Sequence, residues 1–294
     1  MNKATKGVNF HMKTVLGIDV GGSTTKIVGF RENGQQKELI PPLWVRAGDP
    51  VTSIYGAFGK FTMENGLSMK EIDRVLMTGV GSAFARNPLY DGLSCRIVPE
   101  FTSVGLGGLY LSELTDAIVV SMGTGTAIIH AKKEVNGKTT VEYLGGTGVG
   151  GGTLVGLSHK MLGVDTVSHI EELCEGGDLS KVDLRIRDIS TKDLYPGVNY
   201  ELTASNFGKL SDMANKHDIA LGIVNMVGET IGMLSVFAAR NYGLSNVVLT
   251  GNLTRIAPIR QVFAVLEKTF GIHFFIPENA QYGTVIGAAL CEDE

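Results

Sequence analysis

The feature that most constrains the fold is a pattern of strand, glycine turn and strand that occurs twice in the chain. Residues 13–19 (KTVLGID) form a short apolar run that ends at an acidic residue; after the pair Gly21-Gly22, residues 24–30 (TTKIVGF) are again apolar and β-branched. The pattern returns about a hundred residues later, in residues 116–130, around the turn at 123–125 (GTG). Each occurrence predicts an antiparallel hairpin with a tight glycine turn. Two such hairpins indicate an internal duplication.

Hydrophobic periodicity predicts alternating helices and strands in the rest of the chain. Residues 219–241 form the longest predicted helix, because their apolar positions recur at helical spacing. Strands that alternate with helices are typical of α/β layers with largely covered sheets. We expect a flexible leader at 1–12, an N-terminal α/β lobe at 13–114 and a C-terminal α/β lobe at 115–294. Further helices are predicted at 51–65, 102–114, 257–268 and 283–290, and further strands at 74–78, 96–98, 246–250 and 273–276.

Composition and charge exclude several classes of partner. The 294 residues include 26 basic and 30 acidic side chains, a net charge of −4, so the basic surface of a nucleic-acid binder is missing. Cys95, Cys174 and Cys291 lie far apart and in no metal-binding spacing, which disfavours disulfides and fits a reducing cytoplasm. No apolar run reaches the ~18 residues of a spanning helix. We therefore expect a cytoplasmic globular protein with no nucleic-acid or membrane partner.

The first hairpin carries the pattern of a phosphate-binding loop. A glycine pair at a hairpin tip lets backbone N–H groups point at phosphate oxygens, and the hydroxyls that follow add donors. The carboxylate of Asp19, at the end of the first strand, is suited to hold Mg²⁺ through water, because magnesium prefers oxygen ligands and keeps several waters. The alternative is an ordinary hairpin in which Asp19 is a turn former, since short motifs alone are weak signals.

The second hairpin loop, residues 121–126 (SMGTGT), offers the same chemistry. Two such loops at corresponding places in a duplicated chain are a stronger signal, because a nucleoside triphosphate held from both sides needs a pair of them. Residues 250–254 (TGNLT) follow a predicted strand, where the backbone is expected to pack against adenine and ribose. The alternative for Asn252 is a helix cap in a plain strand-to-helix turn.

Residues 145–152 (GGTGVGGG) match GxGxxG, yet they do not indicate a dinucleotide-binding unit. That fingerprint belongs to an N-terminal βαβ unit, whereas this run lies in the middle of the chain between a hairpin and a helix. It predicts a glycine-rich helix entry whose N–H groups face an anion or adenosine. The chain contains no GxxxxGK[ST] sequence, which excludes the P-loop architecture.

In this order the motifs resemble the type II pantothenate kinases, a family within the acetate/sugar kinase, heat-shock cognate and actin superfamily. The resemblance runs from Lys13 to the C-terminus. It implies a duplicated ribonuclease H-like, two-lobed α/β kinase fold that transfers phosphate from ATP, with Mg²⁺, to pantothenate, the first step of coenzyme A biosynthesis. The blocks that carry it are 17–27 (GIDVGGSTTKI), 99–107 (PEFTSVGLG), 121–127 (SMGTGTA), 145–157 (GGTGVGGGTLVGL), 182–189 (VDLRIRDI), 202–209 (LTASNFGK) and 284–288 (TVIGA).

The resemblance also implies a role for single residues. Glu100 corresponds to the catalytic base, which accepts the proton of the attacking hydroxyl; the alternative is a first-turn carboxylate that the helix dipole favours. Asp19 would hold Mg²⁺. Phosphate contacts are implied for Gly21, Gly22, Ser23, Thr24, Thr25, Lys26 and Thr124, and nucleoside contacts for Gly151, Gly152, Thr153, Leu154, Val155 and Asn252.

One position departs from the family. The family usually has an arginine two residues before the glycine pair at 145–146, and this chain has Tyr143, which supplies neither a permanent cation nor a bidentate fork. Either another cation substitutes, from Lys26, Arg185 or Arg187, or the substrate is another small hydroxylated metabolite, or the chain is a catalytically weak nucleotide- or metabolite-binding sensor.

Self-association is also an expectation. Gly228 and Gly232 form a small-xxx-small pair on the long helix, which predicts close helix packing and leaves a self-association face as the alternative. The family resemblance implies a homodimer.

Overall fold

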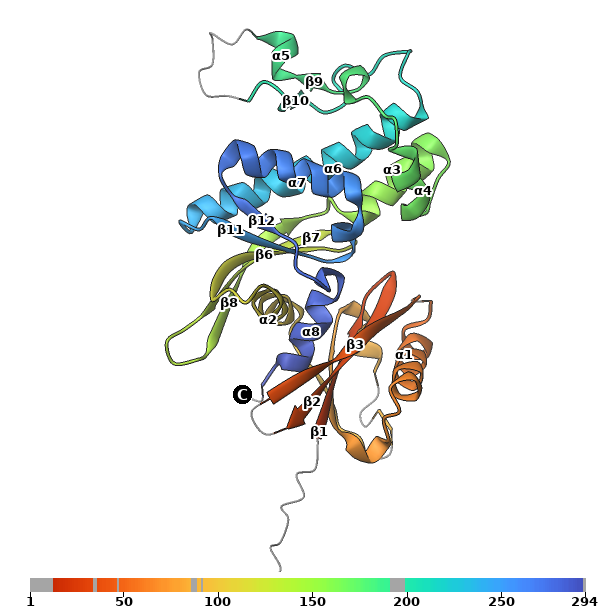
Figure 1. Ribbon diagram of the computed structural model, residues 1–294. Helices are drawn as coiled ribbons and strands as arrows, with labels where there is room; N and C mark the ends of the chain where they lie inside the picture. The colour runs from red at the N-terminus through yellow and green to blue at the C-terminus, as the bar shows by residue number, and fades with distance from the viewer. Residues whose placement is uncertain are drawn as a thin grey trace, which may run out of the picture. The chain divides into compact units, whose positions relative to one another are not determined.

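The computed structural model describes residues 13–33, 36–46, 48–85, 89–90, 92–190 and 199–292, and the leader predicted at 1–12 lies outside these residues. The chain divides into two compact units (Figure 1). The first comprises Met1–Tyr110 together with Tyr282–Glu294, and the second comprises Leu111–Gln281. The described residues 282–292, which the sequence analysis placed in the second lobe, thus belong to the first unit.

Each unit contains a mixed five-stranded sheet with the same topology. In the first unit the order is β3-β2-β1-β4-β5, and in the second it is β8-β7-β6-β11-β12. The three hairpin strands of each sheet are antiparallel, and the remaining two run parallel to the first hairpin strand. This equivalence confirms the internal duplication. The bounds are β1 (Lys13–Val20), β2 (Thr24–Asn33), β3 (Gln36–Arg46), β4 (Ile72–Thr78), β5 (Cys95–Ile97), β6 (Asp116–Met122), β7 (Thr126–Lys133), β8 (Thr139–Thr147), β11 (Asn246–Thr250) and β12 (His273–Phe275).

The predicted helices and strands are all present, with bounds that differ by a few residues. The third strand of each sheet, β3 and β8, was not predicted from the sequence. Both contain residues that disfavour strands, the pair Pro41-Pro42 in β3 and the pair Gly145-Gly146 in β8. Pairing with β2 and β7 overrides that local preference.

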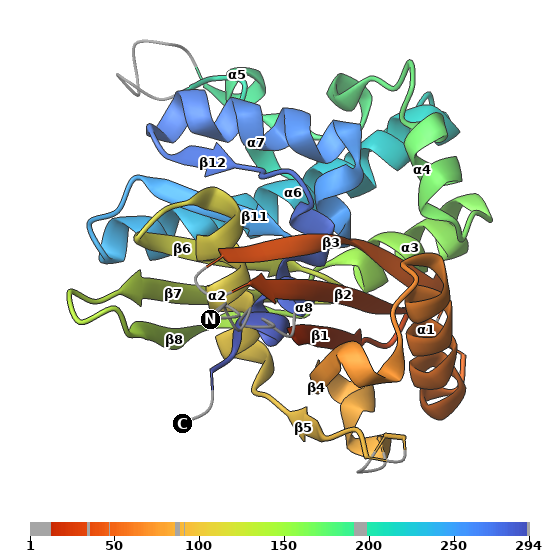
Figure 2. The same cartoon turned by 60° about the horizontal axis from the view of Figure 1, so that its bottom comes forward.

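In the first unit, helices α1 (Pro50–Glu64) and α8 (Gly283–Leu290) pack on the sheet (Figure 2), with α2 (Glu100–Ser112) against α8. The carboxylate of Asp49 caps α1 by accepting from the Thr52 backbone N–H at 2.7 Å. On the other side, α8 lies so close to β1 that a Cβ on Gly17 would be 2.5 Å from the Val285 carbonyl oxygen. This close approach of α8 is why the end of the chain belongs to the first unit.

The second unit is built around the long helix α6 (Lys216–Asn241), which packs against β6, β7 and β11. Its neighbours are α3 (Gly151–Leu162), α4 (Val167–Leu173) and α7 (Ala257–Phe270). A Cβ on Gly228 would lie 3.2 Å from Val262, and one on Gly232 would meet Leu266. The predicted close helix packing at this pair is therefore confirmed, with α7 as the partner helix.

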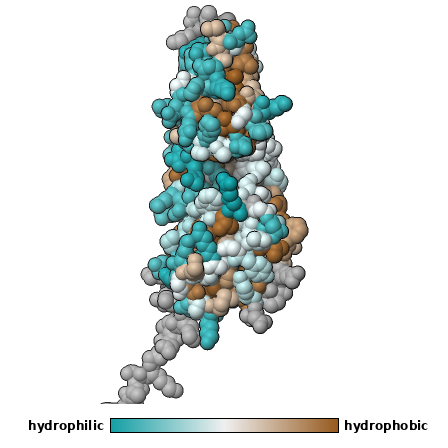
Figure 3. Space-filling model, turned by 90° about the vertical axis from the view of Figure 1, so that its right-hand side faces the viewer, coloured by the Kyte–Doolittle hydropathy of each residue, from teal (hydrophilic) through white to brown (hydrophobic). Residues whose placement is uncertain are grey.

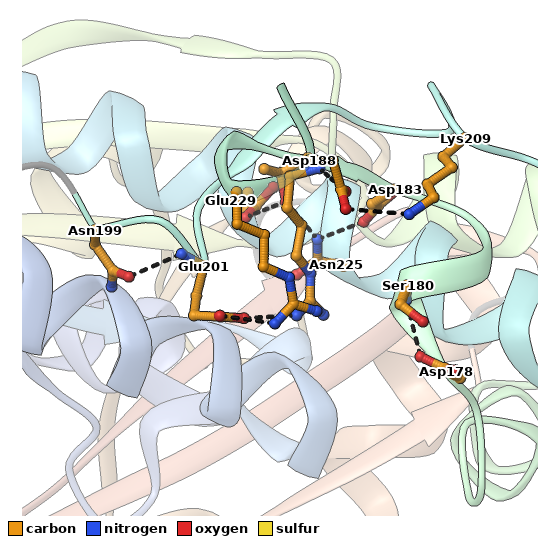
Figure 4. A network of polar contacts seen from close by, with 12 residues as sticks. Asp178, Ser180, Asp183, Asp188, Asn199, Glu201, Lys209, Asn225 and Glu229 are labelled. Carbon is orange, nitrogen blue, oxygen red and sulfur yellow. Dashed lines mark hydrogen bonds and ion pairs between the residues drawn. The ribbon is translucent and has the colours of Figure 1, made fainter. Parts of the chain in front are cut away.

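A small segment of the second unit lies over α6, and we call its described residues, 184–190 and 199–206, the excursion. It contains β9 (Leu184–Arg185), α5 (Ile186–Ile189) and β10 (Thr203–Ser205). The fully buried Asp183 anchors it, because its carboxylate accepts from the Phe207 backbone N–H and from the Asn225 side chain on α6, both at 2.8 Å (Figure 4). Burial raises the pKa of Asp183, against the opposing effect of these hydrogen bonds.

Among the described residues, α6 is the one helix long and apolar enough to cross a membrane, and 61% of its most apolar window is buried inside the protein. Its apolar side chains belong to the core of the second unit. The face drawn in Figure 3 mixes hydrophilic and hydrophobic side chains over the described residues. Helix α6 is therefore a core helix. Cys95, Cys174 and Cys291 are buried and form no disulfide.

Candidate active site

In the first unit, the candidate catalytic residues gather where β1 ends. Asp19 lies opposite Lys26 of β2 and opposite Thr78 of β4, so the three side chains project from the same face of the sheet. Lys26 and Thr78 are buried. Glu100 is the first residue of α2, which follows the edge strand β5. Asp19, Lys26 and Glu100, which we call the carboxylate cluster, come from three elements of one unit.

Both acids of this cluster, Asp19 and Glu100, have raised pKa values. The pKa of Asp19 is raised to about 6, mainly because burial disfavours the charged carboxylate; the Lys26 ammonium opposes this rise and the Glu100 carboxylate adds to it. The Glu100 residue is exposed to solvent overall. The protein around its carboxyl group nevertheless excludes enough water to raise the pKa of Glu100 as well. Two neighbouring acids with raised pKa values are the pattern of a site that handles protons and cations.

The glycine turn of the first hairpin is as tight as the sequence predicted. The Gly21 N–H donates to the Thr24 carbonyl at 3.1 Å, and Gly22 and Ser23 are exposed at the tip. These tip residues are accessible to a phosphate group. Thr25 is fully buried, and its Oγ1 has no hydrogen-bond partner among the described residues, so its side chain faces the protein interior.

The sequence analysis missed the loop that follows β4. Gly79 has a φ of 84°, and a Cβ there would lie 2.6 Å from Asp19 Oδ1. Only glycine allows the loop to pass the Asp19 carboxyl group so closely. The second unit repeats the arrangement, since Gly251 has a φ of 92° and packs on the backbone of Met122. The available signal was the dipeptide Thr-Gly, which ends a strand at 78–79 and again at 250–251.

In the second unit, two glycine loops pack on each other. The N–H groups of Gly151 and Gly152, at the start of α3, donate to the carbonyls of Gly123 and Thr124 at 2.9 and 2.8 Å. We call residues 123–125 and 150–152 the glycine cluster. The glycine-rich helix entry is thus present as predicted, but these two N–H groups hold the hairpin turn of Thr124 instead of facing an anion.

The remaining predicted contacts of the second unit differ in accessibility. Thr124, Gly152 and Asn252 are exposed, and Thr153 and Val155 are half-buried. Leu154 is fully buried in the core, so its side chain is not accessible to a ligand. Thr153 Oγ1 instead closes the start of α3 by donating to the Gly148 carbonyl at 3.0 Å.

Tyr143 stands on β8 with 49% of its surface exposed. The cations suggested as substitutes for the family arginine are engaged in other contacts. Arg185 and Arg187 both pair with Glu201, at 2.7 and 2.8 Å, and Lys26 interacts with Asp19. Each would have to leave its present partner to serve a substrate anion.

The architecture resembles that of two solved structures. The activator of the 2-hydroxyisocaproyl-CoA dehydratase from Clostridium difficile, solved with bound ADPNP, has a TM-score of 0.63 at 20% identity, covering 94% of this chain and 93% of that one. The ROK hexokinase from Thermus thermophilus has a TM-score of 0.53 at 14% identity, covering 94% and 97%. The protein therefore has a duplicated, actin/hexokinase-like α/β fold.

Sequence comparisons narrow this class to one family. The Fumble family matches residues 111–280. The type II pantothenate kinase of Oceanobacillus iheyensis is 28% identical, over 94% of this chain and 98% of the relative, and that of Staphylococcus aureus is 25% identical, over 94% and 99%. The chain belongs to the Fumble family, and these two relatives of it are type II pantothenate kinases. ATP-dependent kinase activity is what this family suggests.

The residues present fit a water-mediated magnesium ion. Among the described residues, no three His, Cys, Asp or Glu side chains form a group that could enclose a metal. Asp19 is a single carboxylate, half-buried, whose charge is disfavoured by burial and by Glu100. A divalent cation beside it would relieve both effects, and Mg²⁺ commonly binds through one carboxylate, water and phosphate oxygens.

Proposed function

We propose that this protein phosphorylates pantothenate at the expense of ATP and forms 4'-phosphopantothenate, the first step of coenzyme A biosynthesis. The observation that carries the proposal is the carboxylate cluster, in which Glu100 and Asp19 have raised pKa values within one unit of a kinase-family fold. The full-length similarity to type II pantothenate kinases supports the choice of substrate.

The proposed reaction assigns one task to each group. The primary hydroxyl oxygen of the substrate forms a bond to the γ-phosphorus, while the bond from that phosphorus to the β,γ-bridging oxygen breaks and ADP leaves. Glu100 orients the hydroxyl group and accepts its proton. Gly21 to Thr24, Lys26 and Thr124 contact phosphate oxygens, and Gly151, Gly152, Thr153 and Val155 with Asn252 contact the nucleoside, whereas the buried side chains of Thr25 and Leu154 take no part. Asp19 is the residue that would hold Mg²⁺, which when bound would neutralise charge on the phosphates.

A second candidate substrate class follows from Tyr143. An exposed tyrosine at the position of the family arginine does not supply a fixed cation for an anionic group. The same machinery would then act on another small hydroxylated metabolite. A chain that only binds nucleotide as a sensor would need no base at Glu100.

Substitution of Glu100 by glutamine tests the proposal. We expect Glu100→Gln to lower kcat for pantothenate-dependent ADP formation by about 10²- to 10⁴-fold, because the base is lost while the shape of the side chain is kept. ATP affinity should change little. Glu64→Gln, on the exposed end of α1, is the matched control. A wild-type protein that binds ATP but forms no ADP with pantothenate would exclude this substrate, and a metabolite panel would then decide between another kinase activity and a sensor.

We also propose that the protein is a cytoplasmic homodimer. Phe237 on α6 and Val265 on α7 are exposed apolar side chains on packed helices of the second unit, and apolar surface of this kind is typically covered in obligate dimers. Light scattering coupled to size-exclusion chromatography should give about twice the chain mass for the wild type, and a monomer mass would contradict the proposal.

A further inference from the structure

A cavity of about 280 Å³ lies within the second unit, and none of its lining residues is assigned to the proposed kinase reaction. Three elements border it: the excursion of β9 to β10, helix α6 and helix α7. Its apolar lining includes Met233, Leu266 and Phe270, and its polar lining includes Thr203, Asn206 and Glu229. An apolar cavity with a few convergent polar groups is the usual form of a small-molecule site.

The polar end of the cavity is organised around the carboxylate of Glu229. Its Oε1 accepts from Thr203 Oγ1 at 2.8 Å, and its Oε2 accepts from Asn206 Nδ2 at 3.0 Å. Both donors are neutral; Thr203 lies on β10 and Asn206 follows it, whereas Glu229 lies on α6. Figure 4 shows Glu229 within this polar network. These two hydrogen bonds fix the orientation of the carboxylate, and neither donor carries a positive charge.

Three described cations close in sequence to the donors Thr203 and Asn206 or to the lining residue Ile186 pair with other carboxylates. Arg185 and Arg187 both pair with Glu201, and Lys209 pairs with Asp188 at 3.1 Å. Among the described residues, Glu229 forms no ion pair. A half-buried carboxylate of fixed orientation and without a cation is electrostatically suited to a positively charged ligand.

We propose that this cavity binds a small organic ammonium ion, with the positive group at Glu229 and an apolar or aromatic body among Met233, Leu266 and Phe270. The ammonium group donates to the carboxylate oxygens, which retain free lone pairs. The methionine thioether and the phenylalanine ring favour an aromatic body. A cavity of about 150 Å³ holds benzene, so this larger one accommodates a ring with a short aminoalkyl chain.

The site goes beyond the proposed kinase function and does not depend on it. Because its lining comes from the excursion on one side and from α6 and α7 on the other, an occupant contacts both. The ligand would therefore stabilise the attachment of the excursion to the core of the second unit.

The probe for this proposal is 2-phenylethylammonium, with 2-phenylethanol as the neutral molecule of nearly equal size. Isothermal titration of the full chain should show one ammonium ion bound per chain, at least about tenfold more tightly than the alcohol, as expected when an ion pair contributes about 1.4 kcal/mol. Glu229→Gln should reduce ammonium affinity by a similar factor. Glu172→Gln, an exposed glutamate on α4 of the same unit, is the matched control and should bind as the wild type does.

A second measurement locates the ligand without relying on a charge variant. The methyl resonance of Met233, assigned by Met233→Leu, should shift on addition of the ammonium ion, and it should shift equally in Glu100→Gln. Equal affinity for the alcohol and the ammonium ion, no shift at Met233, or full affinity in a folded Glu229→Gln protein would each overturn the proposal. If Glu229→Gln does not fold, the proposal is tested by comparing the affinities of the wild type for the ammonium ion and the alcohol, and by the shift of the Met233 methyl resonance.

Discussion

At the residue scale, the ionised form of Asp19 lowers the free energy of unfolding, although it is the form proposed to hold Mg²⁺. Its pKa rises from 3.8 to about 6 on folding, because burial disfavours the carboxylate. Between these two pH values the folded chain keeps a proton that the unfolded chain has lost, so the free energy of unfolding falls as pH rises through this window. Above pH 6 the full cost is present, on the order of 1 to 3 kcal/mol.

Asp19→Asn removes this cost, because asparagine is never charged. We expect the variant to be more stable than the wild type at pH 8, with a free energy of unfolding higher by roughly 1 to 3 kcal/mol, and to lose this advantage near pH 4. Urea unfolding at both pH values measures the difference, with the exposed Asp212→Asn as the control. A variant that is less stable than the wild type at pH 8 would show that the ionised carboxylate is stabilised by contacts that outweigh its burial.

At the element scale, the contact between α2 and α8 depends on glycine. A Cβ on Gly107 of α2 would meet the Gly283 carbonyl of α8, and a Cβ on Gly287 of α8 would meet the Ser103 carbonyl of α2. Backbone atoms cannot yield as the end of a flexible side chain does, so the two helices would have to move apart. Because Glu100 begins α2, this packing also positions the proposed catalytic base.

We predict that Gly107→Ala destabilises the protein by about 1 to 3 kcal/mol or more, as overpacking does. Gly56→Ala in α1 is the matched control, because no atom lies within 4 Å of its Cβ position. There alanine should stabilise by up to about 1 kcal/mol through its higher helix propensity. Chemical denaturation followed by circular dichroism compares the two variants, and equal stabilities would show that α2 and α8 tolerate a wider separation.

At the scale of the whole molecule, the chain returns to its first unit at its end. Helix α8 packs on β1, β2 and β4, and Ala288 and Cys291 share a core cluster with Val15 and Leu76. The last residues therefore cover a sheet whose strands were completed about two hundred residues earlier.

Removal of residues 283–294 should destabilise the first unit selectively, because it exposes the sheet face that α8 covers. Hydrogen exchange is expected to accelerate in β1 and β4 by at least about tenfold, which corresponds to 1.4 kcal/mol of local stability, with a smaller change in α6. A chain shortened by only residues 293–294 is the control. Equal acceleration in both units would indicate that they unfold together.

The sequence by itself determined the elements that rest on local patterns. The alternation at 13–30 and 116–130 with glycine turns specified both hairpins, and the helical spacing of 219–241 specified α6, because turn residues and apolar periodicity act within a few residues. The motif order also led to the family that the comparisons show. For the candidate site, the motifs predicted which residues take part, including Asp19 and Glu100. The roles of these two residues stay predictions.

Only the tertiary structure decided the features that join distant segments. In the folded chain the side chains of Thr25 and Leu154 are buried, and Gly79 lies against the Asp19 carboxyl group. Two N–H groups at the start of α3 donate to the turn at Thr124. The tertiary structure also created the cavity at Glu229, whose hydrogen-bond partner Thr203 is 26 residues away in sequence. The physical reason is common to all: burial and close packing depend on which elements meet, and local propensity carries no information about that.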